Sequence, residues 1–558
     1  MPSSLKVLFL AMDAGDKHLI QKWATDGTLP NLRSLLTKGL VGETVSLDGL
    51  YEGATWPSFY TGVNPAHHGF HSFVQLHPGT YKFYRRYPGE FIKREPFWNY
   101  LSAAGLKMAI LDIPLSGISE GLNGIQMVEW GSHDGVYGFR TWPPKIKWEV
   151  LTRFGRHPLK ISCDSYGRTP GDFCSFKNRL LKGIQRKAEL TIHYLERSDW
   201  NFFAQVFSES HCVGHQCWHL HDPRHPNHDP QVAHDTGDPI LEVYRAIDSA
   251  IGKIIEHVTS DTILFFLASH GMAHHIGGHF LLSEILERLN LAKKWPHDRA
   301  SKKSQSWIKI IYDALGRGWQ KIPTTIKTPF KPTLWSLHNL IMDRVRKEDL
   351  LLLPFSIAQI DLRNSKSFPL NNGNPVSGIR INISGREPNG LIKPGTDLND
   401  FCDGLTRDLL DIVDCDSGIP IVKSVKKTCE LYEGEYCDHL PDLLIEWNDE
   451  KLLGSVKLGN IKGSRLRIAS KKIGVVEGVN YSCRTGDHRQ EGLFIAFGPG
   501  IKPGRLKRTI SIMDFAPTFT GLFDVELPDA DGKPIAEILE AHLRQTQDFS
   551  KHRNLSLP

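Results

Sequence analysis

The chain has 558 residues, of which 40% are hydrophobic and 23% are charged. This is the composition of an ordinary globular protein, and it excludes a chain that is disordered over most of its length. The 67 basic and 62 acidic residues leave a formal net charge of +5, which is too small to indicate nucleic acid as an obligate partner but is compatible with an anionic small-molecule substrate.

The apolar stretch near the N-terminus is too short for a secretory leader. It runs only from Val7 to Met12 and is followed by an acid, which is typical of a buried strand. No stretch approaches the roughly 18 apolar residues that a membrane span needs. The nine cysteines are an odd number without a CxxC pair, which favours reduced thiols. We therefore expect a cytoplasmic protein without a transmembrane segment.

Short apolar runs alternate with amphipathic helical patterns along the chain. The expected strands cover residues 6–12, 107–113, 201–207, 262–268, 442–447 and 493–498. The expected helices cover residues 29–39, with Gly39 as the C-cap, residues 241–257, and a late helix near 517–523. This alternation is typical of a parallel sheet with helices on both faces. The sequence therefore predicts an α/β fold with a mostly parallel sheet between two helical layers.

Residues 293–349 differ in character from the rest of the chain. They contain 13 Lys or Arg against five Asp or Glu, with four interleaved Trp. One interpretation is a solvated insertion that its tryptophans pack onto the core. The other is a lid that presents positive charge to an anionic substrate or a membrane surface. We therefore divide the chain into a core of residues 1–292 and 353–558 and an insertion, lid or cap, of residues 293–352.

Chemistry-bearing side chains cluster near several expected strands. They are Asp13 after the first strand, His211 and His215 after 201–207, Ser269 and His270 after 262–268, and His488 shortly before 493–498. Ligand sites of open α/β sheets lie outside the carboxyl ends of the strands. A single histidine at a strand end is ordinarily a hydrogen-bonded structural residue, but four such clusters in one chain indicate a shared polar site.

The stretch HCVGHQCWH contains three histidines at helical spacing. His211, His215 and His219 recur at i, i+4 and i+8, so on a helix they share one face, and two of them can hold one metal ion. Further histidines follow at positions 221, 225, 228 and 234. The alternative is a surface tract with adventitious metal affinity, although this alternative is weaker for the pair nearest the strand.

Several separated segments match the pattern of one family. VLFLAMDAG has the form of an opening strand with a metal-binding Asp, and WPSFYTGVNPAHHGF that of a nucleophile segment. The other matching segments are GTLPNLRSLLTKG, GIRINISGREPNGLIKPG, HLPDLLIEW, DHRQEGLFIAFGPGI and MDFAPTFTGLFDVELPDADGKPI. Together they resemble the alkaline phosphatase superfamily, most closely its type I phosphodiesterase/nucleotide pyrophosphatase branch, over almost the whole chain. The resemblance implies an alkaline-phosphatase-like α/β/α sandwich with inserted cap segments and phosphohydrolase or phosphomutase activity.

The resemblance also implies a metal centre. In that superfamily two divalent metals, usually zinc, clamp a phosphoryl group between an attacking Ser or Thr oxygen and the leaving oxygen. Carried over residue by residue, Asp13 and His270 belong to the first metal, and His215 and His488 belong to the second. These four positions match the family pattern.

Two ligand positions depart from that pattern. His211 stands where the family has Asp, and Ser269 stands where it has the Asp of an Asp-His-Gly sequence. Both changes remove a carboxylate, whose attraction to a dication is large where water is scarce. Two alternatives follow: a single metal held by His211, His215 and His488, as in three-histidine zinc sites, or two metals in a more electropositive site. The expected metal is zinc, with manganese or iron as other candidates.

The stretch YEGATWPSFYTG offers two alternatives for the attacking group. Counting back nine residues from Thr61 puts Glu52 at the family's nucleophile position, whereas the local Thr-x-Pro pattern selects Thr55. Thr55 offers a hydroxyl at a helix N-terminus, where backbone N–H groups receive a phosphate. Glu52 offers a carboxylate that replaces a missing ligand or acts as a base toward water. Ser58 is a further hydroxyl, which we expect to face into the helix.

These observations predict a metal-dependent hydrolase of phosphate monoesters, phosphodiesters or pyrophosphate bonds in a small or medium-sized anionic metabolite. One alternative is a phosphoryl transferase or phosphomutase in which the basic insertion excludes water. Others are a non-catalytic binding protein on the same fold and an Fe(II) centre of two His and one carboxylate. The sequence indicates neither the identity of the substrate nor the oligomeric state.

Overall fold

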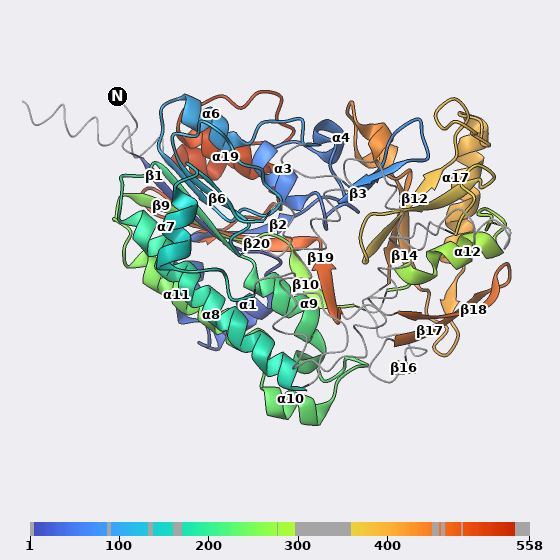
Figure 1. Ribbon diagram of the computed structural model, residues 1–558, viewed down its shortest axis with the longest axis horizontal. Helices are drawn as coiled ribbons and strands as arrows, with labels where there is room; N and C mark the ends of the chain where they lie inside the picture. The colour runs from blue at the N-terminus through green and yellow to red at the C-terminus, as the bar shows by residue number, and fades with distance from the viewer. Residues whose placement is uncertain are drawn as a thin grey trace, which may run out of the picture.

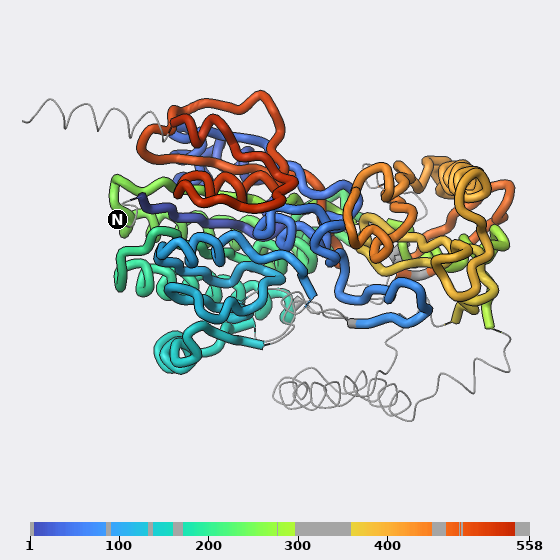
Figure 2. Tube along the Cα trace, turned by 90° about the horizontal axis from the view of Figure 1, so that it is seen from above, coloured from blue at the N-terminus to red at the C-terminus, as the bar shows by residue number. Residues whose placement is uncertain are grey.

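The protein forms two lobes that lie side by side in both views (Figures 1 and 2). The computed structural model describes residues 5–85, 91–131, 138–159, 170–275, 277–295, 359–448, 457–458, 464–480 and 484–541. The larger lobe surrounds a ten-stranded sheet, and the smaller lobe, drawn mainly in yellow and orange, contains two four-stranded sheets.

The ten-stranded sheet has the order β21-β2-β20-β9-β1-β8-β5-β6-β7, with β22 beside β2. Its parallel centre consists of β9 (Thr262–Ala268), β1 (Lys6–Met12), β8 (Phe202–Phe207), β5 (Met108–Leu111) and β6 (Gly124–Val128). Its outer strands are β20 (Glu491–Phe497), β2 (Leu40–Val45), β21 (Gly504–Arg505), β22 (Ile510–Ser511) and β7 (Arg140–Trp142). Met12 pairs with both Phe207 and Ala268. The carboxyl ends of β1, β8 and β9 are therefore level, and the residues that follow them meet at one edge of the sheet.

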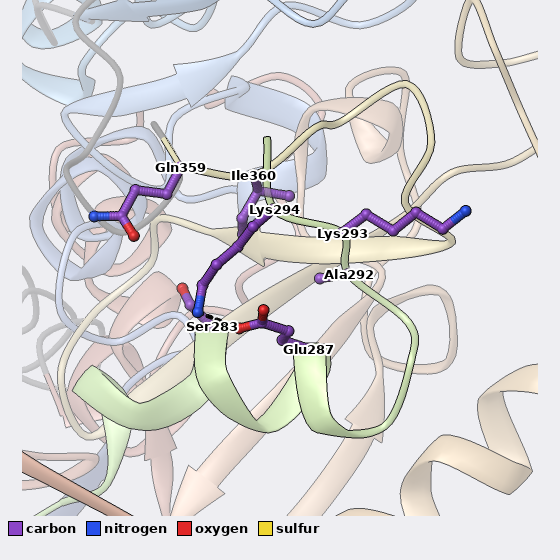
Figure 3. Close-up of a pocket in the computed structure, with 7 residues that line it drawn as sticks. All are labelled: Ser283, Glu287, Ala292, Lys293, Lys294, Gln359 and Ile360. Atoms are coloured by element: carbon purple, nitrogen blue, oxygen red, sulfur yellow. Dashed lines mark ion pairs between the residues drawn. The ribbon is translucent and has the colours of Figure 1, made fainter. Parts of the chain in front are cut away.

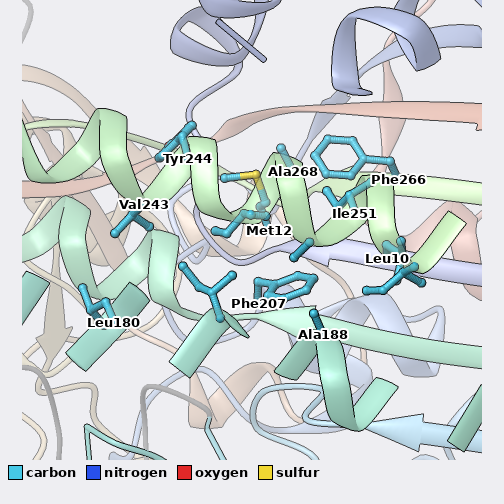
Figure 4. Close-up of a cluster of buried hydrophobic side chains, with 14 of the residues drawn as sticks. Leu10, Met12, Leu180, Ala188, Phe207, Val243, Tyr244, Ile251, Phe266 and Ala268 are labelled. Carbon is cyan, nitrogen blue, oxygen red and sulfur yellow. The ribbon is translucent and has the colours of Figure 1, made fainter. Parts of the chain in front are cut away.

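Helices cover both faces of this sheet. In β1, Leu8, Leu10 and Met12 belong to one apolar cluster, and Val7 and Phe9 belong to another, as the alternation of side chains in a strand requires. The first cluster (Figure 4) packs under α1 (Lys17–Thr25), α2 (Pro30–Lys38), α7 (Ile146–Arg153), α8 (Pro170–Leu195), α9 (Glu209–His221) and α11 (Pro239–Ile255). The second packs under α3 (Thr55–Thr61), α4 (Pro65–His68), α6 (Phe97–Ala103) and α19 (Phe515–Leu522). The three-layer α/β fold expected from the sequence is confirmed.

The expected helices are present, with the start and stop signals that the sequence provides. The helix expected over residues 29–39 is α2, which begins at Pro30 and has Gly39 as its C-cap. The helix expected over 241–257 is α11, whose N-cap Asp238 accepts the backbone N–H of Leu241. The late helix is α19.

The smaller lobe has its own apolar core. One of its sheets is antiparallel, with the order β11 (Ser367–Leu370), β12 (Val376–Ile381), β15 (Leu443–Trp447) and β14 (Val422–Lys427). The other contains β13 (Val413–Asp414), β17 (Ser464–Ser470), β16 (Lys457–Leu458) and β18 (Gly474–Asn480). Helices α12 (Leu282–Arg288) and α17 (Thr396–Leu410) pack on this core.

Two expected strands differ from the parallel arrangement. The run 442–447 forms β15 of the smaller lobe and is no part of the central sheet, and the run 493–498 forms β20, which is antiparallel to β9. An apolar run shows that a strand is buried, but it specifies neither the partner strand nor the direction of pairing. The mostly parallel central sheet is confirmed, and the sequence did not indicate that one of these strands lies outside it and that the other joins it in the antiparallel direction.

A small pocket in the smaller lobe is lined by Ser283, Glu287, Ala292, Lys293, Lys294, Gln359 and Ile360 (Figure 3). Its volume of about 20 Å³ has room for about one water molecule. Nζ of Lys294 forms ion pairs with Glu284 and Glu287, so its charge is already compensated. The pocket therefore has neither the size nor the charge of a substrate site.

The basic insertion expected over residues 293–352 lies, apart from 293–295, outside the described residues. None of the helices that the structure describes is long and apolar enough to cross a membrane. The seven cysteines within the described ranges are free thiols.

Candidate metal centre

Three histidines converge at the carboxyl edge of the central sheet. His211 and His215 lie one turn apart on α9, and His488 lies on β19 (Gly486–Arg489), which pairs with β10 (Gly271–His274). Nε2 of His211 is 2.7 Å from Nε2 of His215 and 3.1 Å from Nε2 of His488. His215 is fully buried, and His211 and His488 are 6% and 2% exposed. The three rings therefore form a compact cluster, called the three-histidine cluster below, from which water is largely excluded.

Protein acceptors hold the opposite nitrogens of two of these rings. Nδ1 of His211 donates to Oδ2 of Asp13 at 2.8 Å, and Nδ1 of His215 donates to the carbonyl oxygen of Gly486 at 2.8 Å. Asp13 is held in turn, because its Oδ1 accepts the indole N–H of Trp56 at 2.7 Å. A carboxylate or carbonyl oxygen behind the ring is the arrangement that orients metal-ligating histidines in proteins.

The hydrogen positions that these bonds imply for the imidazole rings are compatible with a cation bound between them. With hydrogen on Nδ1, neutral His211 and His215 turn lone pairs toward each other across 2.7 Å. Two facing lone pairs repel each other unless a proton or a metal ion lies between them. Burial, together with His270 and His211, lowers the pKa of His488 well below its ordinary value, which favours the neutral form that binds metals. Three neutral imidazoles are a donor set that suits zinc or another divalent transition metal.

Two later histidines of the tract bond to the segment that precedes β19. Nδ1 of His219 is 3.0 Å from Oγ1 of Thr485, and Nε2 of His225 donates to the carbonyl oxygen of Thr485 at 3.0 Å. Nδ1 of His228 donates to the carbonyl oxygen of His219 at 2.7 Å. Burial lowers the pKa of His219 to about 4 and that of His225 to about 3. His219 and His225 therefore connect α9 and the loop after it to the segment that precedes β19, both in their neutral form.

Ser269 and His270 lie beside the three-histidine cluster. The ring centroid of His270 is 4.5 Å from that of His488 and 6.4 Å from that of His211. Within the described part of the chain, however, the groups of three or more possible metal ligands include neither Asp13 nor His270. The structure thus brings all the candidate ligands to one site, but only three of them form the cluster. The roles of Asp13, Ser269 and His270 as metal ligands stay predictions.

A carboxylate from the opening segment borders the cluster. Glu52 forms a second group of possible ligands with Asp487 and His488, whose ligand atoms lie within 4.8 Å of one another. Oε2 of Glu52 accepts the backbone N–H of Asn374 at 2.9 Å, and its Oε1 lies 3.4 Å from Nη1 of Arg484. Asn374 precedes β12, so the smaller lobe holds this carboxylate in place at the centre.

Asp487 is a buried anion at the centre of several donors. It is 0% exposed, and it accepts the side-chain N–H of Asn374 at 3.0 Å and the backbone N–H of His488 at 2.9 Å. Burial raises its pKa, but the neighbouring groups of His275, Arg484 and His488, including the backbone N–H of His488, outweigh burial and lower the pKa to about 2. Asp487 is therefore ionised at neutral pH and supplies negative charge to the site.

The hydroxyl groups of the opening segment are bonded locally. Oγ1 of Thr55 donates to the carbonyl oxygen of Tyr51 and contacts Oγ of Ser46, both at 2.5 Å, and Thr55 is 1% exposed. Ser58 is fully buried, and its Oγ is 2.9 Å from Nε2 of His68. Ser58 thus faces inward, as expected. Both alternatives, attack by Thr55 and attack by a water molecule with Glu52 as the base, stay predictions.

A buried lysine anchors the start of α9. Lys187 of α8 is fully buried, with Nζ 3.4 Å from Oε2 of Glu209 and 3.7 Å from Oδ2 of Asp112. Nε2 of His157 donates to the other oxygen of Glu209 at 2.8 Å. Glu209 is the first residue of α9 and lies two positions before His211. The network therefore ties the helix that carries two histidines of the cluster to the sheet.

Neutralising this lysine is expected to destabilise the protein strongly. Lys187→Met leaves two buried carboxylates without their cation, which costs about 3–5 kcal/mol of unfolding free energy. The matched control is Lys177→Met on the same helix, where the ion pair with Glu242 is partly exposed and is worth about 1 kcal/mol or less. Denaturant unfolding measures both values. Equal losses in the two variants would contradict the anchoring role.

One family comparison covers the N-terminal part of the chain. Residues 7–316, more than half of the chain, match the family described as type I phosphodiesterase/nucleotide pyrophosphatase. The chain belongs to this family. A sequence comparison with curated proteins returns no match.

Among solved structures, the chain is similar to a murine ectonucleotide pyrophosphatase/phosphodiesterase 5, with 12% identity, a TM-score of 0.44, and coverage of 95% of this chain and 97% of that chain. It is also similar to a phosphonoacetate hydrolase from Sinorhizobium meliloti 1021 in complex with phosphonoacetate, with 12% identity, a TM-score of 0.48, and coverage of 97% and 95%. Likeness at this level assigns no substrate to the chain.

Three residues of the candidate site were not predicted from the sequence. They are Asp487, Arg484 and Asn374. Asp487 could have been recognised from the sequence, because it directly precedes the candidate ligand His488 in the segment DHRQEG. Arg484 lies close to the same segment, but an arginine in a loop is ordinarily solvated. Asn374 had no signal, because only the packing of the two lobes brings it to Glu52.

Proposed function

We propose that this member of the type I phosphodiesterase/nucleotide pyrophosphatase family is a metal-dependent hydrolase of phosphate esters that binds one divalent cation, preferably zinc, through His211, His215 and His488. The convergence of three ring nitrogens is the observation that carries the proposal. Asp13 then orients the ring of His211 and is not itself a metal ligand, since both of its carboxylate oxygens are bonded to protein donors. The replacement of an Asp by His211 thus converts the family's centre into a site for one metal.

The protein groups around that cation suit hydrolysis. When bound, a divalent cation supplies Lewis-acid polarisation of a phosphoryl oxygen and stabilises the charge that develops there. Glu52 accepts the proton of the attacking water, because its carboxylate borders the cluster and the backbone N–H of Asn374 holds one of its oxygens. Water attacks phosphorus, the bond from phosphorus to the leaving oxygen breaks, and the proton resides on Glu52.

Arg484 is proposed to bind the anionic oxygens of the substrate. Its guanidinium is 17% exposed and lies between Glu52 and Asp487, at 3.4 and 3.8 Å. A hydrogen bond to a charged group contributes about 1.5–3 kcal/mol, so Arg484→Met is expected to raise KM for a phosphate ester by about tenfold or more. Arg484→Lys keeps the charge and is expected to recover part of the loss. Steady-state kinetics check this, and an unchanged KM in Arg484→Met would contradict the assignment.

The alternatives have less support. The hypothesis of phosphoryl transfer depended on the exclusion of water by the basic insertion of residues 293–352. That insertion lies almost entirely outside the described residues. Phosphorus NMR with an added acceptor alcohol distinguishes transfer from hydrolysis, because transfer yields a new ester. A non-catalytic binding protein would bind its ligand without metal, with an affinity that His215→Ala leaves unchanged.

The proposal is tested with the full-length protein on bis(p-nitrophenyl) phosphate and p-nitrophenyl phosphate. Activity is measured as purified, after treatment with a chelator, and after addition of zinc, manganese or iron. We expect hydrolysis of at least one ester, loss of this activity with the chelator, and recovery with metal. A protein that contains no transition metal and hydrolyses neither ester under any supplementation would contradict the proposal.

A further inference from the structure

The bonding of Ser269 and His270 determines which nitrogen of the imidazole carries hydrogen. Oγ of Ser269 is 3.4 Å from the backbone N of Ala14 and 3.0 Å from Nδ1 of His270. The backbone N–H of Ala14 can only donate, so the serine oxygen accepts there. The hydroxyl of Ser269 is buried and its hydrogen needs an acceptor, and of the two side-chain contacts that the structure describes for Ser269 only Nδ1 of His270 can accept it. Ala14 has a φ of 50°, a left-handed conformation that is uncommon outside glycine and that is compatible with this bond.

A neutral imidazole that accepts at Nδ1 carries its hydrogen on Nε2. His270 is 2% exposed, and among the described residues its Nε2 has no hydrogen-bond partner. A buried donor without an acceptor is unfavourable, and in native structures such an atom calls for a specific explanation. The Nε2–H group is therefore available to an acceptor that is not part of the described chain.

We infer that His270 donates its Nε2–H to a phosphoryl oxygen of the substrate and does not bind metal. A metal ligand must present a lone pair, and Ser269 places hydrogen where that lone pair would be. The ring of His270 lies 4.5 Å from the ring of His488, so a phosphoryl group at the three-histidine cluster is within its reach. The phosphoryl nature of the acceptor rests on the proposed function, whereas the position of the hydrogen rests on Ser269.

The serine at position 269 is the feature that sets this role. The family pattern has Asp here, and a carboxylate can only accept. Besides offering an oxygen to a metal, a carboxylate here would take hydrogen from Nδ1 of His270 and leave a lone pair on Nε2 for the metal. Ser269 reverses the direction of that bond. The residue that the family uses as a ligand thus becomes a neutral donor for an oxyanion, in keeping with a centre that holds one metal.

Four zinc-loaded forms of the full-length protein test the inference: wild type, His270→Gln, His270→Phe and Ser269→Asp. Glutamine keeps an N–H near the position of Nε2, whereas phenylalanine keeps the ring volume without a donor. Zinc per chain is measured by mass spectrometry, and the affinity for inorganic phosphate is measured by titration calorimetry. These readouts are independent of catalytic turnover.

We expect about one zinc per chain in wild type, His270→Gln and His270→Phe. Phosphate is expected to bind about tenfold or more weakly to His270→Phe, and within about threefold of wild type to His270→Gln, because only the second variant keeps the donor. Ser269→Asp is expected to bind more zinc than wild type, approaching two per chain. If Ser269→Asp does not fold, Ser269→Ala replaces it, and we expect weaker phosphate binding than in wild type.

A loss of zinc in either His270 variant overturns the inference, because His270 would then be a ligand. Wild-type affinity for phosphate in His270→Phe or in Ser269→Ala overturns it as well. A wild-type protein that binds phosphate with the expected pattern but hydrolyses no ester contradicts the proposed function and supports the donor role of His270.

Discussion

Replacing His215 by alanine is expected to abolish metal binding and to lower kcat/KM by about 10³-fold or more. The fully buried ring supplies one of the three nitrogens of the cluster, and a Lewis acid contributes several kcal/mol to a phosphoryl transition state. Each 1.4 kcal/mol corresponds to a factor of ten in rate. Metal analysis of the purified variant and steady-state kinetics with a phosphate ester measure the two effects.

The matched control is His219→Gln, one turn further along the same helix. His219 bonds to Thr485 and not to the cluster, and glutamine can keep that bond. We expect this variant to retain its metal and to keep kcat/KM within about threefold of wild type. If His215→Ala retained a full complement of metal, or if His219→Gln lost it, the assignment of the ligands would be wrong.

Replacing Glu52 by glutamine is expected to lower kcat by about 10²–10⁴-fold while the metal is retained. The amide oxygen can still accept the N–H of Asn374, so the position of the side chain is kept and only its basicity is lost. Steady-state kinetics with metal analysis separate this effect from a loss of metal.

The competing nucleophile is tested with Thr55→Val. This variant removes the hydroxyl that bonds to Tyr51 and Ser46 and is expected to cost about 1–2 kcal/mol of unfolding free energy. We expect its kcat to stay within about threefold of wild type. An inactive Thr55→Val together with an active Glu52→Gln would instead establish a hydroxyl nucleophile.

The central sheet could be predicted from the sequence because its strands are buried on both faces. Residues 6–12 and 262–268 are apolar almost throughout, and their first and last residues are those of β1 and β9. The chemistry-bearing residues could be predicted to converge because Asp13, His211 and Ser269 follow strands of one sheet. His488 was singled out because it lies shortly before residues 493–498, and the family resemblance implied its role as a metal ligand, but it lies on no strand of that sheet.

Other features depend on contacts that no local pattern encodes. The bond from His211 to Asp13 depends on the orientation of two side chains 198 positions apart. Lys187 was not recognised, since a lysine in an amphipathic helix ordinarily lies in water, and its burial depends on Asp112 and Glu209. The smaller lobe could not be distinguished from the larger one by sequence, because the apolar run of β15 does not reveal which sheet the strand joins.

The most direct test of the account is anomalous diffraction from crystals of the zinc-loaded full-length protein. We predict one zinc peak per chain, within about 2.0–2.1 Å of Nε2 of His211, His215 and His488, with none between Asp13 and His270. A second peak between Asp13 and His270 would contradict the one-metal centre, and the absence of any peak at the three histidines would contradict the metal-dependent mechanism as a whole.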